Sequence, residues 1–297
     1  MKKQLLALAV LALAAGTASA QLNDTLAKIK SSGTVNLGVR DSSGLGFTIG
    51  GGKYVGFHTE MAERIVDDLK KVVGGDLKIN YQVITSQNRI PLLQNGTIDF
   101  ECGSTTNNAT RAKDVSFAVT TFVEEVRIAT KANSGIKSVA DLNGKTVAVT
   151  TGTTSVQHLR KHERGANIDF KTVQGKDHAD SFLLLESGRA DAFVMDGSIL
   201  AANIAKSKNA KDFAIVGEVL SVEPIACMLR KDDPKMNAAL DDSIKRQIKD
   251  GSLAKLYDKW FMQPIPPNNV SLNMPLSAST KSAWEHPNDK PMEEYGK

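Results

Sequence analysis

The segment Ile98-Asp-Phe-Glu-Cys-Gly-Ser-Thr-Thr-Asn-Asn-Ala-Thr-Arg111 joins a short apolar run to a long polar loop. Its first part, Ile98–Cys102, predicts a β-strand, and Gly103–Arg111 predicts a loop rich in hydroxyl and amide groups that ends in an arginine. Because ligands of open α/β sheets bind outside the ends of the strands, we expect this junction to face a binding site.

Strands and helices alternate on the N-terminal side of this segment. After a first helix at Leu22–Lys30, the pattern predicts strands at Thr34–Arg40 and Leu77–Ile84 and helices at Glu60–Val73 and Asn88–Gln94. A turn-rich loop is expected at Gly44–Gly52. This order indicates parallel strands that are covered by helices.

A second, smaller α/β unit follows the turn at Asp141–Lys145. Its predicted elements are strands at Thr146–Thr150, Ile168–Val173, Ala192–Met195 and Phe213–Val216 and helices at Val156–Glu163, His178–Ser187 and Ile199–Lys206. The unit holds about 100 residues, which is an ordinary domain size.

The chain is then expected to return to the first unit. A strand at Glu223–Arg230 precedes helices at Asp233–Asp250 and Leu253–Phe261, and the prolines of Gln263–Pro267 interrupt regular structure. The polar tail beyond Asn268 is predicted to wrap the surface or to stay partly loose.

Residues 1–20 have the three parts of an export signal. Lys2 and Lys3 precede an apolar run at Leu5–Ala15, and small residues at Ala18–Ala20 mark the expected cleavage site. The run is shorter than the roughly 20 residues that span a bilayer. The mature chain, residues 21–297, is therefore predicted to be periplasmic. The formal net charge of +4 includes both signal lysines, so the mature chain lacks the basic excess typical of nucleic-acid binders.

Cys102 and Cys227 are the two cysteines of the chain. Export into an oxidising compartment favours a disulfide between them, and two buried free thiols are the alternative. Their spacing matches no zinc motif, so no metal site is expected.

Groups that bind carboxylates recur at the predicted ends of strands. Arg40 ends the first strand, Thr85–Arg89 opens a helix, Gly103–Arg111 follows a strand, and Thr150–Ser155 opens a helix of the second unit. Free N–H groups at a helix start favour an anion, and a guanidinium donates two parallel hydrogen bonds to a carboxylate. Singly these residues are ordinary caps or surface arginines, but together they predict a cleft for an anion. Asp196, which follows a strand, either accepts an ammonium group there or caps the next helix.

The sequence has no motif typical of catalysis. None of its five histidines has H-E-x-x-H spacing, no serine lies in G-x-S-x-G, and no phosphate-binding loop occurs. Glu101, His178 and Glu186 remain as candidates for a general acid or base, and none has a clear partner. We therefore predict that the chain is not an enzyme.

Six segments carry a family resemblance. The two most specific are Thr85–Thr97 and Phe100–Asn108, and the others are Lys176–His178, Leu185–Ala190, Cys227–Asp233 and Asp258–Phe261. They resemble the glutamate/aspartate periplasmic binding proteins of ABC importers, which form part of solute-binding protein family 3. The match covers nearly the whole mature chain.

The resemblance implies a periplasmic binding protein fold of two Rossmann-like α/β lobes, joined by a two-strand hinge, with the ligand between them. Lobe 1 would comprise residues 21–124 and residues 221–297 with the tail, and lobe 2 would comprise residues 125–220. The hinge is expected near Thr121–Val126 and Val219–Pro224. His58, which stands where the broader family often has aspartate, is not assigned to the site.

The resemblance also implies two groups of ligand contacts. The residues expected at the α-carboxylate are Arg111, Ser104, Thr106 and Thr154. Asp196 is expected to accept the α-ammonium group. Those expected around the side-chain carboxylate are Arg40, Ser86, Arg89 and His178.

The predicted function is the binding of L-glutamate or L-aspartate and its delivery to the membrane subunits of an ABC importer. The protein is expected to act as a monomer, without a cofactor, by closing about its hinge. One alternative is a binding protein for glutamine or asparagine, which the additional arginines oppose. Another is a dehydratase-like enzyme on the same fold, which the lack of a positioned acid or base opposes.

Overall fold

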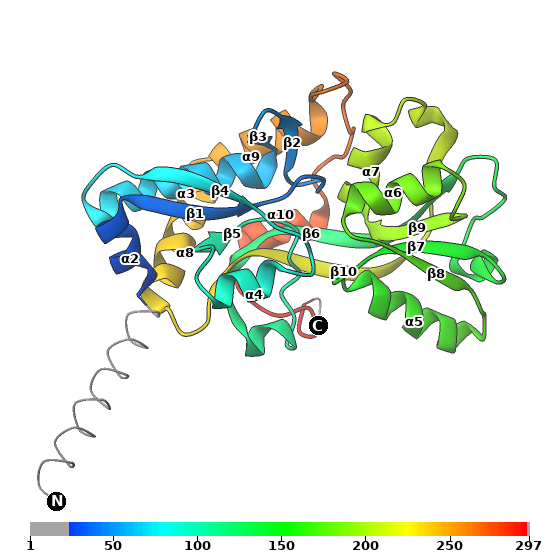
Figure 1. The fold of residues 1–297 in the computed structure, drawn as a ribbon, viewed down its shortest axis with the longest axis horizontal. Helices are drawn as coiled ribbons and strands as arrows, with labels where there is room; N and C mark the ends of the chain where they lie inside the picture. The colour runs from blue at the N-terminus through cyan, green and yellow to red at the C-terminus, as the bar shows by residue number, and fades with distance from the viewer. Residues whose placement is uncertain (1–23, 296–297) are drawn as a thin grey trace, which may run out of the picture.

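A computed structural model describes residues 24–295, and the predicted export signal lies outside them. The chain forms two lobes side by side, each of which has strands flanked by helices (Figure 1). Within the described part of the chain, no helix is long and apolar enough to cross a membrane.

One sheet runs through both lobes with the strand order β4-β1-β5-β10-β6-β9-β7-β8. Its strands are β1 (Thr34–Val39), β4 (Lys78–Val83), β5 (Phe100–Glu101), β6 (Val115–Lys131), β7 (Thr146–Thr150), β8 (Lys171–Gly175), β9 (Ala192–Asp196) and β10 (Phe213–Arg230). Strands β4, β1 and β5 are parallel, as are β9, β7 and β8. Strands β6 and β10 are antiparallel to each other and pass from one lobe into the other.

Lobe 1 contains β4, β1, β5 and a set of helices that come from both ends of the chain. These helices are α2 (Thr25–Ser32), α3 (Phe57–Val73), α4 (Arg89–Gln94), α8 (Pro234–Lys249), α9 (Ser252–Tyr257) and α10 (Ala278–Glu285). Lobe 2 contains β9, β7, β8 and the helices α5 (Ser155–Ala166), α6 (His178–Glu186) and α7 (Gly197–Lys206).

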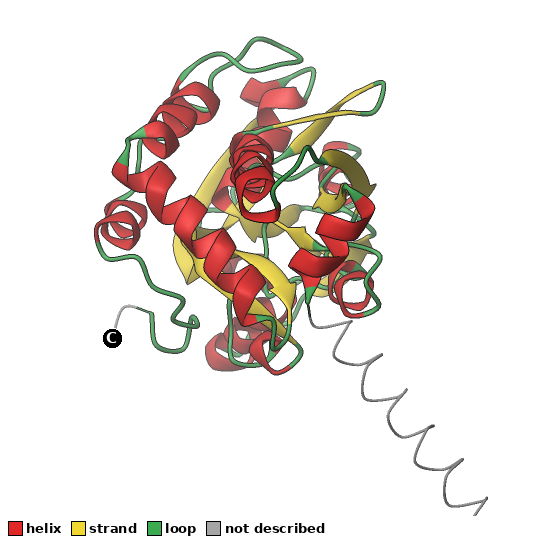
Figure 2. Cartoon of the chain, turned by 90° about the vertical axis from the view of Figure 1, so that its left-hand side faces the viewer, coloured by secondary structure: helices red, strands yellow, loops and turns green. Residues whose placement is uncertain are grey.

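Each lobe buries both faces of its part of the sheet. Along β10, Ile225 and Cys227 belong to one apolar cluster of lobe 1, whereas Ala226 and Met228 belong to the other. Two further clusters fill lobe 2 in the same way. Viewed from the side of lobe 1, helices lie on both faces of the sheet (Figure 2). Parallel strands are stable in this arrangement because helices shield both of their faces, and the predicted α/β class is confirmed.

Four features differ from the sequence prediction. The 17-residue strand β6 was not predicted, and β10 is one strand of 18 residues where two short strands were expected. The loop at Gly44–Gly52 contains strand β2 (Phe47–Gly50), which pairs with β3 (Lys53–Val55). The tail contains α10, and the Trp284 indole donates to the backbone oxygen of Thr121 at 2.8 Å. Tertiary contacts, rather than local periodicity, stabilise these elements.

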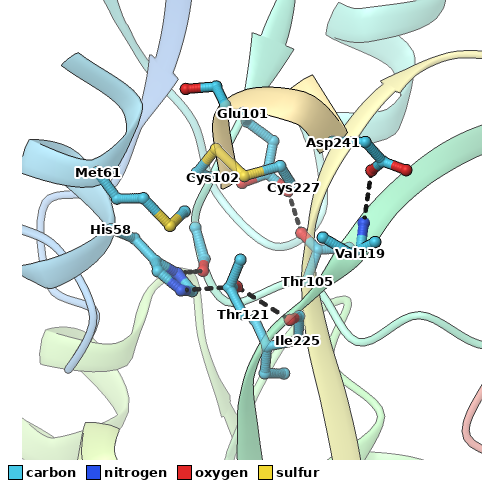
Figure 3. Close-up of a disulfide and its surroundings, with 12 residues drawn as sticks. His58, Met61, Glu101, Cys102, Thr105, Val119, Thr121, Ile225, Cys227 and Asp241 are labelled. Carbon is cyan, nitrogen blue, oxygen red and sulfur yellow. Dashed lines mark hydrogen bonds between the residues drawn. A yellow bond between two sulfur atoms is a disulfide. The ribbon is translucent and has the colours of Figure 1, made fainter. Parts of the chain in front are cut away.

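A disulfide joins Cys102, just after β5, to Cys227 in β10, as predicted (Figure 3). Both residues are buried in the core of lobe 1. The two cysteines are 125 residues apart in sequence, and the chain between them includes all of lobe 2. The bridge therefore fixes the point where the chain returns to lobe 1.

His58, at the start of α3, lies below the same region (Figure 3). Its Nδ1 is 2.6 Å from the backbone oxygen of Gly103, and its Nε2 is 2.9 Å from the hydroxyl of Thr121. A carbonyl oxygen only accepts, so Nδ1 carries the proton. The single proton of the Thr121 hydroxyl has two acceptors in reach, Nε2 of His58 and, at 3.1 Å, the backbone oxygen of Ile225. Burial lowers the pKa of this ring to about 4. The neutral ring thus connects α3, the loop after β5 and strand β6.

The two lobes approach each other closely at two glycines. A Cβ atom on Gly44 would lie 2.3 Å from the backbone of Ser198 at the start of α7. A Cβ atom on Gly152, whose φ is +82°, would lie 2.8 Å from the backbone of Gln87. These positions accept no side chain while the lobes are together.

Gly44→Ala is expected to hold the lobes apart, because its methyl group would overlap backbone atoms that have no room to move. Small-angle X-ray scattering should give a larger radius of gyration for this variant than for the wild type. Gly75→Ala, at a position with open space around it, is the control and should leave the radius unchanged. An unchanged radius for Gly44→Ala would contradict the described approach of the lobes.

Reduction of the Cys102–Cys227 bridge is expected to lower the free energy of unfolding by about 2–4 kcal/mol, because it frees a long loop in the unfolded chain. Urea titrations with and without reductant measure this difference. Alkylation of the native exported protein without reductant should label neither cysteine, and labelling of both would rule out the bridge.

The protein should lose stability as the pH falls from 7 to 5. The pKa of His58 is about 4 in the folded chain against an ordinary value of 6.5, so the unfolded chain binds more protons between these values. At pH 5 this difference lowers the free energy of unfolding by about 2 kcal/mol relative to high pH. Urea unfolding at both pH values should show a smaller pH effect in His58→Asn. The exposed His286→Asn is the control, and equal pH effects in the two variants would disprove the assignment.

Candidate functional site

The nine predicted ligand contacts lie where the two lobes meet. Lobe 1 contributes its residues from the ends of β1 and β5 and from the start of α4, and lobe 2 contributes from the starts of α5 and α6 and the end of β9. All except Arg111, which is partly exposed, are buried. In order they are Arg40, Ser86, Arg89, Ser104, Thr106, Arg111, Thr154, His178 and Asp196.

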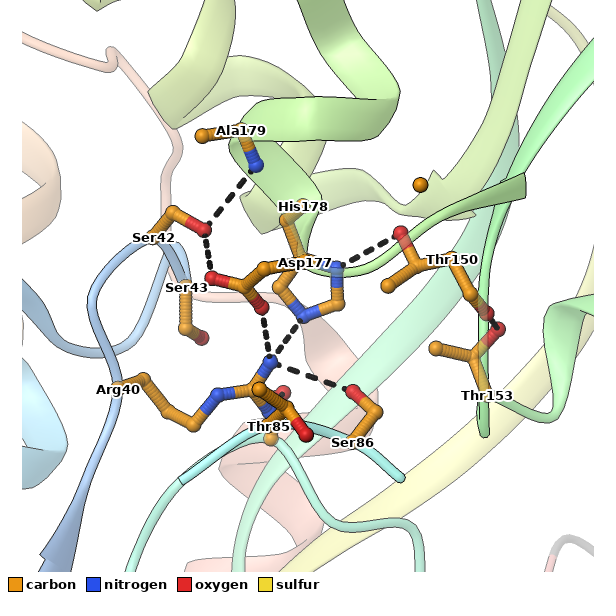
Figure 4. Close-up of polar contacts among 12 residues, drawn as sticks. Arg40, Ser42, Ser43, Thr85, Ser86, Thr150, Thr153, Asp177, His178 and Ala179 are labelled. Atoms are coloured by element: carbon orange, nitrogen blue, oxygen red, sulfur yellow. Dashed lines mark hydrogen bonds and ion pairs between the residues drawn. The ribbon is translucent and has the colours of Figure 1, made fainter. Parts of the chain in front are cut away.

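Arg40 makes contacts with side chains of both lobes (Figure 4). Its Nη2 lies 3.2 Å from the Ser86 hydroxyl and its Nη1 lies 3.3 Å from that of Ser104, both in lobe 1. The same Nη2 lies 2.8 Å from Oδ1 of Asp177 and 2.9 Å from Nε2 of His178, both in lobe 2. Four of the predicted residues therefore form one cluster, to which Asp177 supplies a counter-charge.

His178 is the first residue of α6 and is completely buried. Its Nε2 faces the guanidinium of Arg40, which only donates, so Nε2 must accept. Its Nδ1 carries the proton and donates to the Thr150 hydroxyl at 3.1 Å. Burial and the nearby Arg40 lower the pKa of His178 to about 3, so the ring is neutral at physiological pH.

Arg89 and Arg111 use only part of their donor capacity within the protein. An Nη1 of Arg89 donates to the backbone oxygen of Ser104 at 3.2 Å, and its Nε has no partner among the described residues. Arg111 donates to the backbone oxygens of Thr106 at 2.9 Å and of Gly152, in lobe 2, at 3.3 Å. Burial, followed by the charge of Arg111, lowers the pKa of Arg89. Such desolvated guanidinium groups attract an anion strongly.

Carboxylates lie beside these arginines on the hinge side. Asp196 is 1% exposed, and its Oδ1 has no partner within residues 24–295. Burial and the neighbouring Glu124 and Glu223 raise its pKa well above the ordinary value, while Arg89 and Arg111 oppose the shift. Cationic and anionic groups thus lie within electrostatic reach of one another in one buried region.

Glu223, in β10, accepts two hydrogen bonds and lies against a histidine. Its carboxylate accepts from the hydroxyl of Thr106 and, at 2.8 Å, from that of Thr154, and it lies 2.9 Å from Nε2 of His158. Burial alone would raise the pKa of Glu223, but these hydrogen bonds lower it below the ordinary value. A threonine hydroxyl has one proton, so both hydroxyls turn lone pairs, rather than a donor, toward any further partner.

Sequence reasoning missed the residues that support this cluster. Asp177 lies inside a quoted family segment, and Glu223 and Glu124 are charged positions inside apolar strands, which is a usable signal. The alternative catalytic residues do not gather. Glu186 is exposed at the far end of α6, and Glu101 is buried with its Oε1 accepting from Thr105. No group of metal-binding side chains occurs in the part of the chain that the structure describes.

Two known proteins align with this chain along nearly its whole length. The chain is 44% identical to the glutamate/aspartate import solute-binding protein of Escherichia coli (strain K12) over 297 residues, 98% of each chain. It is 41% identical to the L-glutamate/L-aspartate-binding protein of Pseudomonas aeruginosa over 286 residues, 95% of this chain and 94% of that one.

A solved structure extends the comparison to three dimensions. A crystal structure of a mutant of ArgBP from T. maritima matches with a TM-score of 0.71 and 31% identity, covering 80% of this chain and 100% of that one. The predicted two-lobed fold is therefore confirmed. The chain also matches the model of the bacterial extracellular solute-binding proteins, family 3, over residues 35–263. The chain belongs to family 3 of the bacterial extracellular solute-binding proteins.

Proposed function

We propose that the protein binds L-glutamate or L-aspartate between its lobes and delivers it to an ABC importer. The observation that carries the proposal is that three guanidinium groups, from Arg40, Arg89 and Arg111, lie within electrostatic reach of one another and of the Asp196 carboxyl group in one region between the lobes. Relatives that align along nearly the whole chain are named for these two amino acids.

The α-amino-acid end of the ligand is assigned to the hinge side of the cleft. Arg111 would hold the α-carboxylate, and Asp196 would accept the α-ammonium. The hydroxyls of Thr106 and Thr154 donate their protons to Glu223, so only their lone pairs are available to a ligand. We therefore assign these two hydroxyls to the α-ammonium. The hydrogen bonds that were expected from them at the α-carboxylate are assigned to the backbone of the surrounding loops instead. The hydroxyl of Ser104, which was expected at the α-carboxylate, lies 3.3 Å from Nη1 of Arg40 at the other end.

The side-chain carboxylate of the ligand is assigned to the opposite end. There Ser86 and the neutral His178 surround Arg40, and Arg89 has donor capacity to spare. Burial would raise the pKa of Asp177, but Arg40 and His178 outweigh burial and lower it to about 2. Asp177 is therefore ionised and already balances the charge of Arg40. Arg89 thus supplies the charge that a second ligand carboxylate must balance.

The alternative functions have less support. A neutral ligand such as glutamine would leave a buried guanidinium without a counter-charge, which is costly. An enzyme on the same fold needs an acid or base that exchanges protons near neutral pH, and among the candidates from the sequence His178 is unsuitable because its pKa is about 3. The named relatives are described as binding proteins rather than enzymes.

The proposal includes a hinge motion in the periplasm. Residues 21–124 and 221–297 would move as lobe 1 against residues 125–220 as lobe 2, with β6 and β10 bending between them. A ligand that contacts both lobes stabilises the closed form over the open one. The closed monomer would then dock on the membrane subunits of the importer and release its ligand there.

Arg89→Ala is expected to weaken glutamate binding at least about tenfold more than glutamine binding, because the lost charge-assisted hydrogen bond pairs only with the second carboxylate. Arg111→Ala should abolish the binding of every amino acid. Isothermal titration with glutamate, aspartate and their amides measures both effects.

The exposed Arg164→Ala, on α5, is the matched control and should bind all four ligands as the wild type does. Equal losses of glutamate and glutamine in Arg89→Ala would contradict the assignment of the side-chain end. A wild type that binds neither acid would overturn the proposed function itself.

A further inference from the structure

Helix α6 is not capped by its own residues. Asp177 occupies the position before the first helical residue but makes no side-chain hydrogen bond to the first turn of α6. Its carboxylate instead accepts from Arg40 and Ser42 of lobe 1. The backbone N–H of Ala179, in the first turn of α6, donates to the hydroxyl of Ser42 at 3.1 Å (Figure 4). The N-terminal cap of this lobe 2 helix therefore comes from lobe 1.

Helix α7 has a similar arrangement at its other end. The side-chain amide of Asn268 donates to the backbone oxygens of Ala205 at 3.1 Å and Lys206 at 3.2 Å, which are the last carbonyls of α7. Asn268 lies in the segment whose Ile265 packs into the core of lobe 1. A second lobe 2 helix is thus capped by a side chain of lobe 1.

A third contact lies beside the second cap. The ammonium of Lys206 lies 3.5 Å from the centre of the Phe47 ring in strand β2. Phe47 in turn packs edge-on against Trp260 of lobe 1, with ring centres 5.8 Å apart. A cation over an aromatic face adds to the attraction between α7 and lobe 1.

We propose that Ser42 and Asn268 of lobe 1 cap helices of lobe 2. These caps hold the two lobes together and thereby set the affinity for every ligand. The inference rests on the proposed function for its ligands, but neither residue belongs to the proposed ligand contacts. Opening the hinge breaks both caps and exposes the helix ends to water, so each cap favours the closed form. The apparent affinity for any ligand scales with the population of the form that binds it.

This mechanism differs measurably from direct ligand contact. A residue that acts through closure changes the affinity for all ligands by one common factor. A residue that touches the ligand changes the ratio between ligands. Because Ser42 and Asn268 lie at separate helix ends, their effects should also multiply in a double variant.

The experiment titrates Ser42→Ala, Asn268→Ala and the double variant with glutamate and aspartate. We expect Ser42→Ala to weaken both ligands by about threefold to tenfold and the exposed Asn268→Ala to weaken both by about twofold. Stopped-flow measurements should show faster dissociation by similar factors. An unchanged affinity, or a changed ratio between the two acids, would overturn the proposal.

Ser277→Ala is the matched control. The Ser277 hydroxyl accepts from the backbone N–H of Thr280 at 3.1 Å, so it caps α10 wholly within lobe 1. Its loss should lower the melting temperature and leave both affinities unchanged. A loss of affinity equal to that of Ser42→Ala would show that capping acts through stability alone and would overturn the proposal.

Hydrogen exchange in the protein without added ligand separates this proposal from the proposed function. Ser42→Ala should speed exchange at the Ala179 amide and leave the Thr280 amide unchanged, whichever amino acid the protein binds. If the wild type bound neither acid but showed this change, the ligand assignment would fail and the cap would stand. If both acids bound and the Ala179 amide were unaffected, the cap alone would fail.

Discussion

The antiparallel pairing of β6 with β10 is the constraint on which the rest of the structure depends. These strands run together from Val115 beside Arg230 to Lys131 beside Phe213, so their backbone hydrogen bonds continue from one lobe into the other. Each lobe adds its parallel strands to the edges of this pair. The register of the pair shifts between Val216 and Ser221, and such a shift bends a strand locally without ending its pairing.

The site is built from charges that the fold buries and then balances incompletely. Arg40 has Asp177 as its partner, and Glu223 accepts two hydroxyl groups and lies against His158. Asp196 retains an oxygen without a partner in the described chain. The desolvation penalty of burying such charged groups exceeds the attraction between them unless a ligand pairs with those that lack a partner. The same imbalance that lowers stability therefore provides affinity, which is common at functional sites.

Helix ends serve two purposes in this molecule. Toward the cleft, the starts of α4, α5 and α6 offer N–H groups and partial positive charge to an anion. Toward the opposite lobe, the start of α6 is capped by Ser42 and the end of α7 is capped by Asn268. Both purposes depend on backbone groups at helix ends that have no partner inside their own helix.

The sequence by itself determined the strands and helices with clear periodicity, the pairing partner of Cys102 and, through the family resemblance, the arginines that converge on the site. These follow from local patterns and short motifs, which act over a few residues. Only the tertiary structure decided that β10 is one strand, that α10 forms against Thr121, and that Glu223 and Asp177 meet side chains more than a hundred residues away. Such contacts depend on how two lobes approach in space, and no local spacing encodes that approach.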